Sequence, residues 1–128
     1  MRIAITGGTG SLGAALTSHF LAAGAERIVV FSRSEFSQAM MAQSLEGEFG
    51  QAKTARLRFL LGDVRDRHRL AQAFHGCDIV VHCAALKRID AVAFHVAEIM
   101  KTNVVGTQNV IDAAMEAGVG KVLFISSD

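Results

Sequence analysis

A cluster of glycines directly after the first apolar segment limits the folds open to this chain more than any other feature. A short apolar run at 2–6 precedes the sequence GGTGSLG at 7–13, where the glycine spacing fits both GxGxxG and GxxGxxG. In a turn between a strand and a helix, such glycines permit a tight bend, close approach of a pyrophosphate and close helix packing. The free N–H groups of the helix N-terminus then face the anion.

Short apolar runs alternate with longer helical patterns along the rest of the chain, which predicts a parallel sheet flanked by helices. We expect strands at 2–6, 27–31, 57–61, 78–83 and 121–126, and helices at about 11–23, 35–45, 66–74 and 96–117. The strands are almost unbroken apolar runs, so both faces of the sheet should be buried. The sequence therefore predicts an α/β Rossmann-type fold, a doubly wound parallel sheet of five strands in the order 3-2-1-4-5, truncated on its C-terminal side.

Apolar stripes predict which side of the first and last helices faces the sheet. In the first helix the stripe is Leu12, Leu16 and Phe20. In the last helix it is Met100, Val104, Thr107, Ile111 and Ala114. We expect the second helix to be broken by Gly47 and Gly50, because glycine disfavours helix interiors.

Composition narrows the classes of protein to consider. The chain has 128 residues, 51% of them hydrophobic, which fits one globular domain at 1–128. A net charge of +1 offers no basic field for a polyanion, so no nucleic-acid partner is expected. No apolar run reaches about 18 residues, so we expect no membrane span, and the start does not have the pattern of a signal peptide.

Cysteine and histidine usage indicates a reducing compartment and no metal. Two cysteines, Cys77 and Cys83, fit the cytoplasm better than a disulfide scaffold. Cys83 lies in an apolar run, so we expect a buried, inert thiol. His82 lies in the same run and is expected to be a hydrogen-bonded core residue, and no His or Cys spacing matches a metal site.

The residues after the second strand bear on which dinucleotide this turn would bind. An acidic side chain there holds the ribose 2′-hydroxyl of NAD. This chain has Ser32 and Arg33 instead, and a guanidinium suits a 2′-phosphate. NADP is therefore favoured, with NAD possible because Glu35 follows closely. Two alternatives stay open: a glycine turn without a ligand, and Arg33 as a solvated loop charge.

Six segments in order resemble the extended short-chain dehydrogenase/reductases: TGGTGSLG at 6–13, SRSEFSQ at 32–38, GDVRD at 62–66, HCAALK at 82–87, KTNVVGTQNVIDAA at 101–114 and SSD at 126–128. The chain most closely resembles the first part of the UDP-N-acetylglucosamine 4,6-dehydratases (inverting) of polysaccharide biosynthesis. The resemblance implies the NADP-binding part of a lyase that passes a hydride to and from the cofactor while a UDP-sugar loses water.

The resemblance also implies roles for individual residues. It assigns the cofactor site to the glycine turn, the ends of the strands and the last helix: Gly7, Gly8, Thr9, Gly10, Ser11, Leu12, Gly13, Ser32, Arg33, Asp63, Val64, Ala84, Ala85 and Asn103. Asp63 would accept from the exocyclic amine of adenine. Ser127 and Asp128 would be catalytic, and Lys87 would lie near the cofactor or substrate. Asp63 as a turn cap, Lys87 as a surface charge and Asn103 as a satisfied helix residue are the structural alternatives.

The chain departs from the family pattern where catalysis is concerned. The family uses the Tyr of a Tyr-x-x-x-Lys pair as its base, and this chain has no Tyr. Loss of a general base costs about 10²–10⁴-fold, so we expect the isolated chain to be inactive. Without a substrate domain the strand at 121–126 would be an open edge, which predicts self-association. An epimerase or reductase fragment and a non-catalytic NADP-binding module remain as alternatives.

Overall fold

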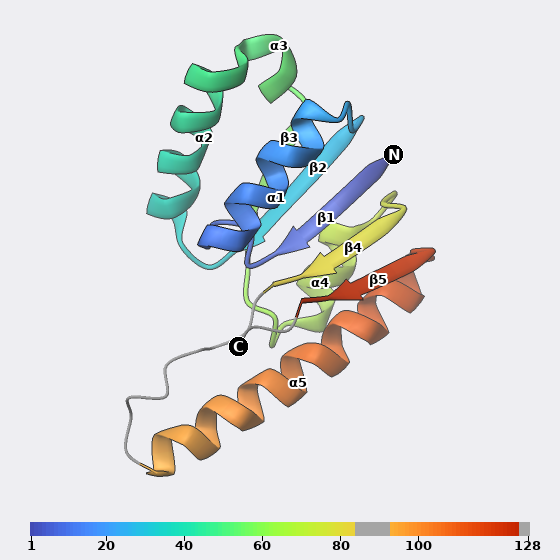
Figure 1. The fold of residues 1–128 in the computed structure, drawn as a ribbon. Coiled ribbons are helices and arrows are strands. Elements are labelled where there is room, and N and C mark those ends of the chain that lie inside the picture. The colour runs from blue at the N-terminus through green and yellow to red at the C-terminus, as the bar shows by residue number, and fades with distance from the viewer. Residues whose placement is uncertain (84–92, 126–128) are drawn as a thin grey trace.

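The computed structural model describes residues 1–83 and 93–125, with side chains described outside 93–103. Five parallel strands form one sheet in the order β3-β2-β1-β4-β5 (Figure 1). The strands are β1 (Arg2–Thr6), β2 (Arg27–Ser32), β3 (Leu57–Leu61), β4 (Ile79–His82) and β5 (Lys121–Phe124). The predicted Rossmann-type strand order is therefore confirmed.

Helices cover both faces of this sheet (Figure 1). The helices are α1 (Ser11–Ala22), α2 (Glu35–Phe49), the short α3 (Gln51–Thr54), α4 (Arg67–Phe74) and α5 (Ala93–Ala117). Strand residues alternate between two apolar clusters: Ile3 and Ile5 pack with the side of α1 and α2, whereas Ala4 packs with the side of α4 and α5. This alternation follows from the pleat of a strand, whose successive side chains point to opposite faces.

Burial on both faces holds for the inner strands and fails at the edges. β1, β2 and β4 are buried along almost their whole length. The edge strands β3 and β5 are only partly covered, and Leu123 and Phe124 of β5 are 44% and 45% exposed. Each edge strand has one neighbour instead of two, so the prediction of full burial was wrong for these two strands.

The predicted apolar stripes of α1 and α5 are only partly correct, because Leu16, Phe20 and Ala114 pack in the core as expected but other members do not. In α1 the buried residues are Gly13, Thr17 and Leu21, and Leu12 is 39% exposed. In α5 the buried positions include Gly106 and the run around Val110, whereas Val104 is 69% exposed. Small residues face the neighbouring backbone at the points of closest approach, and a count of apolar side chains does not register them. Met100 lies outside the described side chains.

The second helix runs further than predicted. α2 continues through Gly47 and ends at Gly50, whose φ of +83° suits glycine. A single glycine inside a helix costs only about 1 kcal/mol, which the packed residues of α2 offset. The start of α2 is capped by Ser34, which accepts a hydrogen bond from Ser37 N at 3.1 Å. Asp66 caps α4, accepting from Arg69 N at 3.1 Å.

Within the described residues, no helix has the length and apolar character needed to cross a bilayer.

Candidate functional site

The segments that follow β1 to β4 meet at one end of the parallel sheet; we call residues 7–10, 33–34, 62–66 and 83 the carboxyl rim. Ligands of doubly wound folds bind at this end, where the strand order reverses. Here the reversal lies between β1 and β4, which pair directly. The glycine turn at 7–10 leaves β1 at that point and opens α1. The turn therefore has the location that a dinucleotide site requires.

Three glycines of this turn are demanded by the fold itself. Gly7 has a φ of +66°. A Cβ on Gly8 would lie 2.6 Å from Val30 Cγ1, and Gly8 N donates to Phe31 O at 3.2 Å. A Cβ on Gly13 would lie 2.5 Å from Gly7 O. Gly8 therefore ties the turn to β2, and Gly13 brings α1 against the turn.

Gly10 is different, because nothing in the described part of the chain requires a glycine there. Its φ of −71° and ψ of 171° suit any residue, and among the described atoms a Cβ would meet only Gly7 O at 3.4 Å. It is the N-cap of α1, a position that favours Ser, Thr, Asp or Asn, yet no side chain caps the helix and no acidic residue lies in its first turn. A ligand that approaches the backbone at Gly10 explains the glycine, so the geometry fits an anion at the N-terminus of α1.

The side chains beside the turn do not cover it. Ser11 and Leu12 are exposed and Thr9 is half-exposed. Their backbone N–H groups belong to the turn and the first turn of α1, where intrahelical partners are missing by geometry. The predicted residues of the glycine turn thus come together on an open surface.

A buried polar pair joins the ends of β1 and β4 beside the turn. The Thr6 hydroxyl and His82 Nδ1 share a hydrogen bond, and the same hydroxyl accepts from Cys83 N at 3.3 Å. His82 is 7% exposed, and burial lowers the pKa of its imidazole, so the ring is held neutral. The expected hydrogen-bonded core role of His82 is confirmed. Thr6 was not identified from the sequence, where its only signal is a polar residue at the end of an apolar strand.

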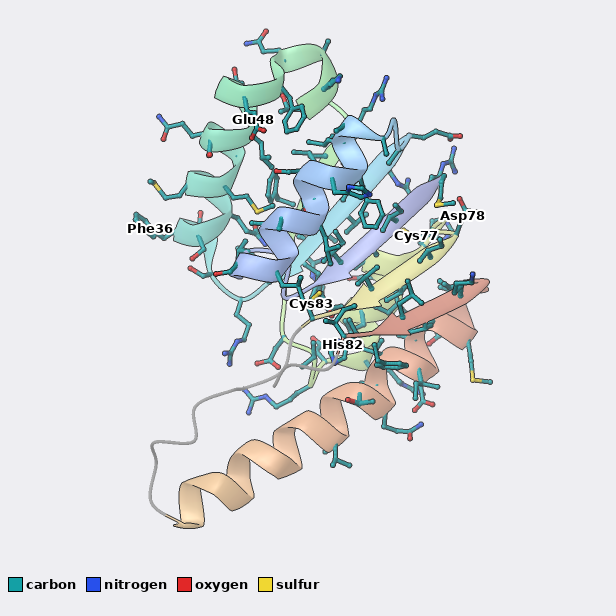
Figure 2. The ribbon with its side chains drawn as sticks, in the orientation of Figure 1. Phe36, Glu48, Cys77, Asp78, His82 and Cys83 are labelled. Carbon is teal, nitrogen blue, oxygen red and sulfur yellow. The ribbon has the colours of Figure 1, made fainter. Side chains whose placement is uncertain are left out.

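The two cysteines lie at opposite ends of β4 (Figure 2). Cys77 is buried, and burial raises the pKa of its thiol. Cys83 is only half-buried on the carboxyl rim, so the prediction that it is buried was wrong. It follows the last residue of β4, where the helix layers cover the chain less fully.

Ser32 and Arg33, at the end of β2, differ in their exposure to solvent. Ser32 is buried and its hydroxyl accepts from Gln38 Nε2 at 3.0 Å. The same amide donates to Leu60 O at 2.8 Å, so Gln38 ties the ends of β2 and β3 together. Arg33 is exposed and is the member of the pair that is open to a ligand. Gln38 was not identified from the sequence, because its contacts depend on the neighbouring strand.

Asp63 follows β3 and is bound by Arg65. The carboxylate accepts from Arg65 N at 2.9 Å, from Nε at 3.2 Å and from Nη2 at 2.9 Å. These hydrogen bonds hold the pKa of the Asp63 carboxyl below its usual range, and the charge of Arg33 acts in the same direction. Two cations thus flank one carboxylate on the carboxyl rim. Arg65 was not identified from the sequence.

Val64 faces the protein more than the rim. It packs on the core cluster under α4 and α5, and a Cβ on Gly106 would lie 2.8 Å from its Cγ2. Its carbonyl accepts from Asn109 Nδ2 at 3.0 Å, so α5 fixes this turn. Asn109 was also missed, since a polar residue on a helix gives no sign of its distant partner.

The remaining predicted site residues cannot be placed. Ala84, Ala85, Lys87, Ser127 and Asp128 lie outside the described residues. Asn103 lies on the backbone of α5, and its side chain is outside the described part. Among the described residues, no three His, Cys, Asp or Glu side chains gather as metal ligands would.

Comparisons with known proteins agree with this geometry. The family described as "Polysaccharide biosynthesis protein" matches residues 3–128. The chain is 39% identical over 127 residues to a UDP-N-acetylglucosamine 4,6-dehydratase (inverting) of Campylobacter jejuni, covering 98% of the chain and 36% of that protein. It is 41% identical over 128 residues to a UDP-glucose 4-epimerase of Rickettsia rickettsii, covering 97% of the chain and 36% of that protein.

A solved structure has the same fold and carries ligands. It is a UDP-glucose-4-epimerase from Stenotrophomonas maltophila with bound NAD and formylated UDP-arabinopyranose, with a TM-score of 0.85 and 27% identity. The match covers 99% of this chain and 37% of that one. The chain therefore spans little more than a third of the length of the proteins it matches.

Proposed function

The chain belongs to the family of polysaccharide biosynthesis proteins, and from this premise we propose that residues 1–128 are the NADP-binding domain of a nucleotide-sugar 4,6-dehydratase. The observation that carries the proposal is Gly10, a glycine that the fold does not need, at the N-terminus of α1 on the carboxyl rim. The dehydratase relative and the resemblance of the six segments support the same assignment.

Different residues of the described part would bind different parts of the cofactor. The amides at Ser11 and Leu12, in the first turn of α1, would receive the diphosphate, whereas the Gly10 amide donates to Gly7 O at 3.1 Å and Gly10 would only leave room for the ligand. Arg33 would take the 2′-phosphate through its guanidinium fork. The cofactor, when bound, would supply the nicotinamide that accepts a hydride from the sugar and returns it.

Asp63 would hold the adenine end. Its carboxylate is only partly exposed and lies one segment away from Arg33, because β2 and β3 pair side by side. An ionised carboxylate only accepts hydrogen bonds, which suits the exocyclic amine of adenine. The lowered pKa keeps Asp63 ionised over the whole neutral range.

Titration with NADP and NAD tests this assignment. We expect both to bind, with NADP about tenfold tighter, because a charge-assisted contact to the 2′-phosphate is worth about that much. Arg33→Asp should reverse the preference, since it restores the acidic residue that suits a ribose hydroxyl. Absence of binding by either cofactor would refute the proposal, and an unchanged preference would exclude Arg33 as the phosphate ligand.

The catalytic residues of the family are only partly present in this sequence. The resemblance gives Ser127, Asp128 and Lys87 catalytic parts, but the Tyr base of the family is absent from this sequence. We propose that this chain alone forms no 4-keto-6-deoxy product from UDP-N-acetylglucosamine. Turnover by the isolated chain in a product assay would contradict this.

A UDP-sugar 4-epimerase part is the second candidate, because the Rickettsia epimerase is as similar to this chain as the dehydratase is. A non-catalytic NADP-binding module is the third, supported by the missing Tyr. Joining the chain to the remainder of a dehydratase or of an epimerase discriminates between the two enzymes, since only the matching chimera should turn over its UDP-sugar.

We also propose a UDP-sugar as the partner and self-association through β5. The edge strand leaves Leu123 and Phe124 about half exposed, and an open edge invites pairing with another chain. Light scattering of the chain at rising concentration tests this. We propose a location in the cytoplasm, because the two cysteines fit a reducing compartment better than a disulfide scaffold.

A further inference from the structure

We propose that Arg65 is a positioning residue that fixes the Asp63 carboxylate so that one acceptor site is left for the amino group of adenine. The inference rests on the proposed function and deepens it, because it names the group that makes the site select an amino-purine. Arg65 itself need not contact the cofactor.

The hydrogen bonds of Asp63 leave one defined acceptor position. An ionised carboxylate has about four lone-pair sites, two on each oxygen. Oδ1 accepts from the Arg65 backbone N at 2.9 Å and from Nε at 3.2 Å, whereas within the described part of the chain Oδ2 accepts only from Nη2 at 2.9 Å. One lone pair of Oδ2 is therefore unused by the arginine. Because the guanidinium is planar and binds both oxygens, the direction of that lone pair is set.

The backbone of this turn is held without help from the Arg65 side chain. Asp66 N donates to Asp63 O at 2.9 Å, and Asn109 on α5 donates to Val64 O at 3.0 Å. Arg69 Nε donates to Leu61 O at 2.8 Å just before the turn. Removal of the guanidinium should therefore leave the carboxylate held only at Oδ1, by the Arg65 backbone N, so that the direction of Oδ2 is less restricted while the chain around it keeps its path.

A purely structural role explains the pair poorly. The Arg65 side chain is 63% exposed, and ion pairs in such surroundings contribute little to stability. The partner carboxylate is 28% exposed, so it is accessible from the solvent side of the rim. An exposed guanidinium that orients a partly accessible carboxylate contributes more to ligand binding than to the stability of the fold.

The test compares NADP with nicotinamide hypoxanthine dinucleotide phosphate, in which a carbonyl replaces the amino group of adenine. Facing Asp63, that carbonyl places an acceptor against an acceptor, so the wild-type chain should bind NADP about tenfold tighter. In Arg65→Gln the preference should fall to about twofold or less. Arg65→Lys should behave like Arg65→Gln, because an ammonium is a single point donor and cannot form the fork.

Arg67→Gln is the matched control. Arg67 is exposed on the first turn of α4, and the described residues include no hydrogen bond or ion pair of its side chain. The variant removes the same charge from the same part of the surface, so it should keep the tenfold preference. The ratio of the two affinities is insensitive to a general loss of attraction for phosphate, since both probes carry the same phosphates.

The outcomes separate this inference from the proposed function. If the wild-type chain binds neither probe, the proposed function fails and the inference with it. If both probes bind equally well, NADP binding stands and the assignment of Asp63 and Arg65 to the amine is overturned. A tenfold preference that survives in Arg65→Gln, or that Arg65→Lys restores, also overturns the positioning role.

Discussion

At the amino ends of the strands, glycines and charged side chains have structural roles in the fold. At the carboxyl rim, some glycines and charged side chains have no such role among the described residues. We call the turns that precede β2, β4 and β5, at 23–26, 75–78 and 118–120, the amino rim. Its glycines Gly24, Gly76 and Gly118 have φ values of +90°, +77° and +75°, which explains each of them by backbone conformation. Gly10 on the carboxyl rim has no such explanation.

Polar groups on the amino rim bind the first residues of neighbouring strands. Asp78 accepts from Arg2 N at 2.8 Å, and Arg27 Nη2 donates to His75 O at 2.7 Å (Figure 2 shows Asp78 at this end). The open end of α1, by contrast, has no side-chain cap among the described residues. The comparison agrees with our proposal that the cofactor binds at the carboxyl rim and not at the amino rim.

The largest expected effect comes from exchanging a glycine on each rim. Gly10→Ala should weaken NADP binding about 100-fold, because a methyl group would occupy the approach of the diphosphate, while unfolding free energy falls by about 1 kcal/mol or less. Gly24→Ala should leave affinity unchanged and cost about 1–2 kcal/mol, because its φ is positive. Calorimetric titration and urea unfolding measure both. A loss of affinity in both variants would erase the distinction between the rims.

The buried pair beneath the rim should contribute to stability. Thr6→Val leaves His82 Nδ1 without its hydroxyl partner and should lower the free energy of unfolding by about 1–3 kcal/mol. Thr54→Val, at an exposed hydrogen bond near the amino rim, is the control and should change it by about 0.5 kcal/mol or less. Equal losses in urea unfolding would show that the Thr6–His82 pair has no special weight.

The stability of the chain should decrease in acid because of His82. Burial lowers the folded-state pKa of this histidine, so the unfolded chain binds the proton first as pH falls. The contribution is fully present above the unfolded pKa of about 6.5 and is lost below it, by at most about 1.4 kcal/mol per pH unit. His82→Asn should reduce this slope in unfolding measurements between pH 7 and pH 5, and the exposed His19→Gln should retain it. An unchanged slope in His82→Asn would assign the acid sensitivity elsewhere.

The smallest effect is expected for the charged pair on the carboxyl rim. Arg65→Gln should leave the urea midpoint unchanged within error, because Arg65 is exposed and its pair with Asp63 is screened by solvent. A clear loss of stability would mean that this pair serves the fold as the amino rim does.

The sequence was sufficient for the strand order and the glycine turn, because both depend on local patterns. Long apolar runs mark parallel strands, and the spacing of Gly7, Gly10 and Gly13 marks the turn. The predicted apolar stripe of α1 omitted Gly13 and Thr17, which are buried where α1 comes closest to the turn and sheet. A hydrophobic period marks bulky apolar side chains, whereas these close contacts require small residues.

The sequence named residues of the candidate site but not the side chains that hold them in place. Arg33 and Asp63 stand at strand ends, where position alone suggests a role. Gln38, Arg65 and Asn109 were missed because each acts through an atom of another segment, and such contacts exist only once the chain has folded. The sequence likewise did not reveal that the Ser32 hydroxyl accepts a hydrogen bond from Gln38.

Backbone amide shifts on addition of NADP test the central claim most directly. We predict that the amide signals of Gly10, Ser11 and Leu12 move on titration in an NMR spectrum of the labelled chain, while those of Gly24 and Gly118 on the amino rim stay in place. Unmoved signals at the turn, or shifts confined to the amino rim, would contradict the assignment of the glycine turn as a diphosphate site.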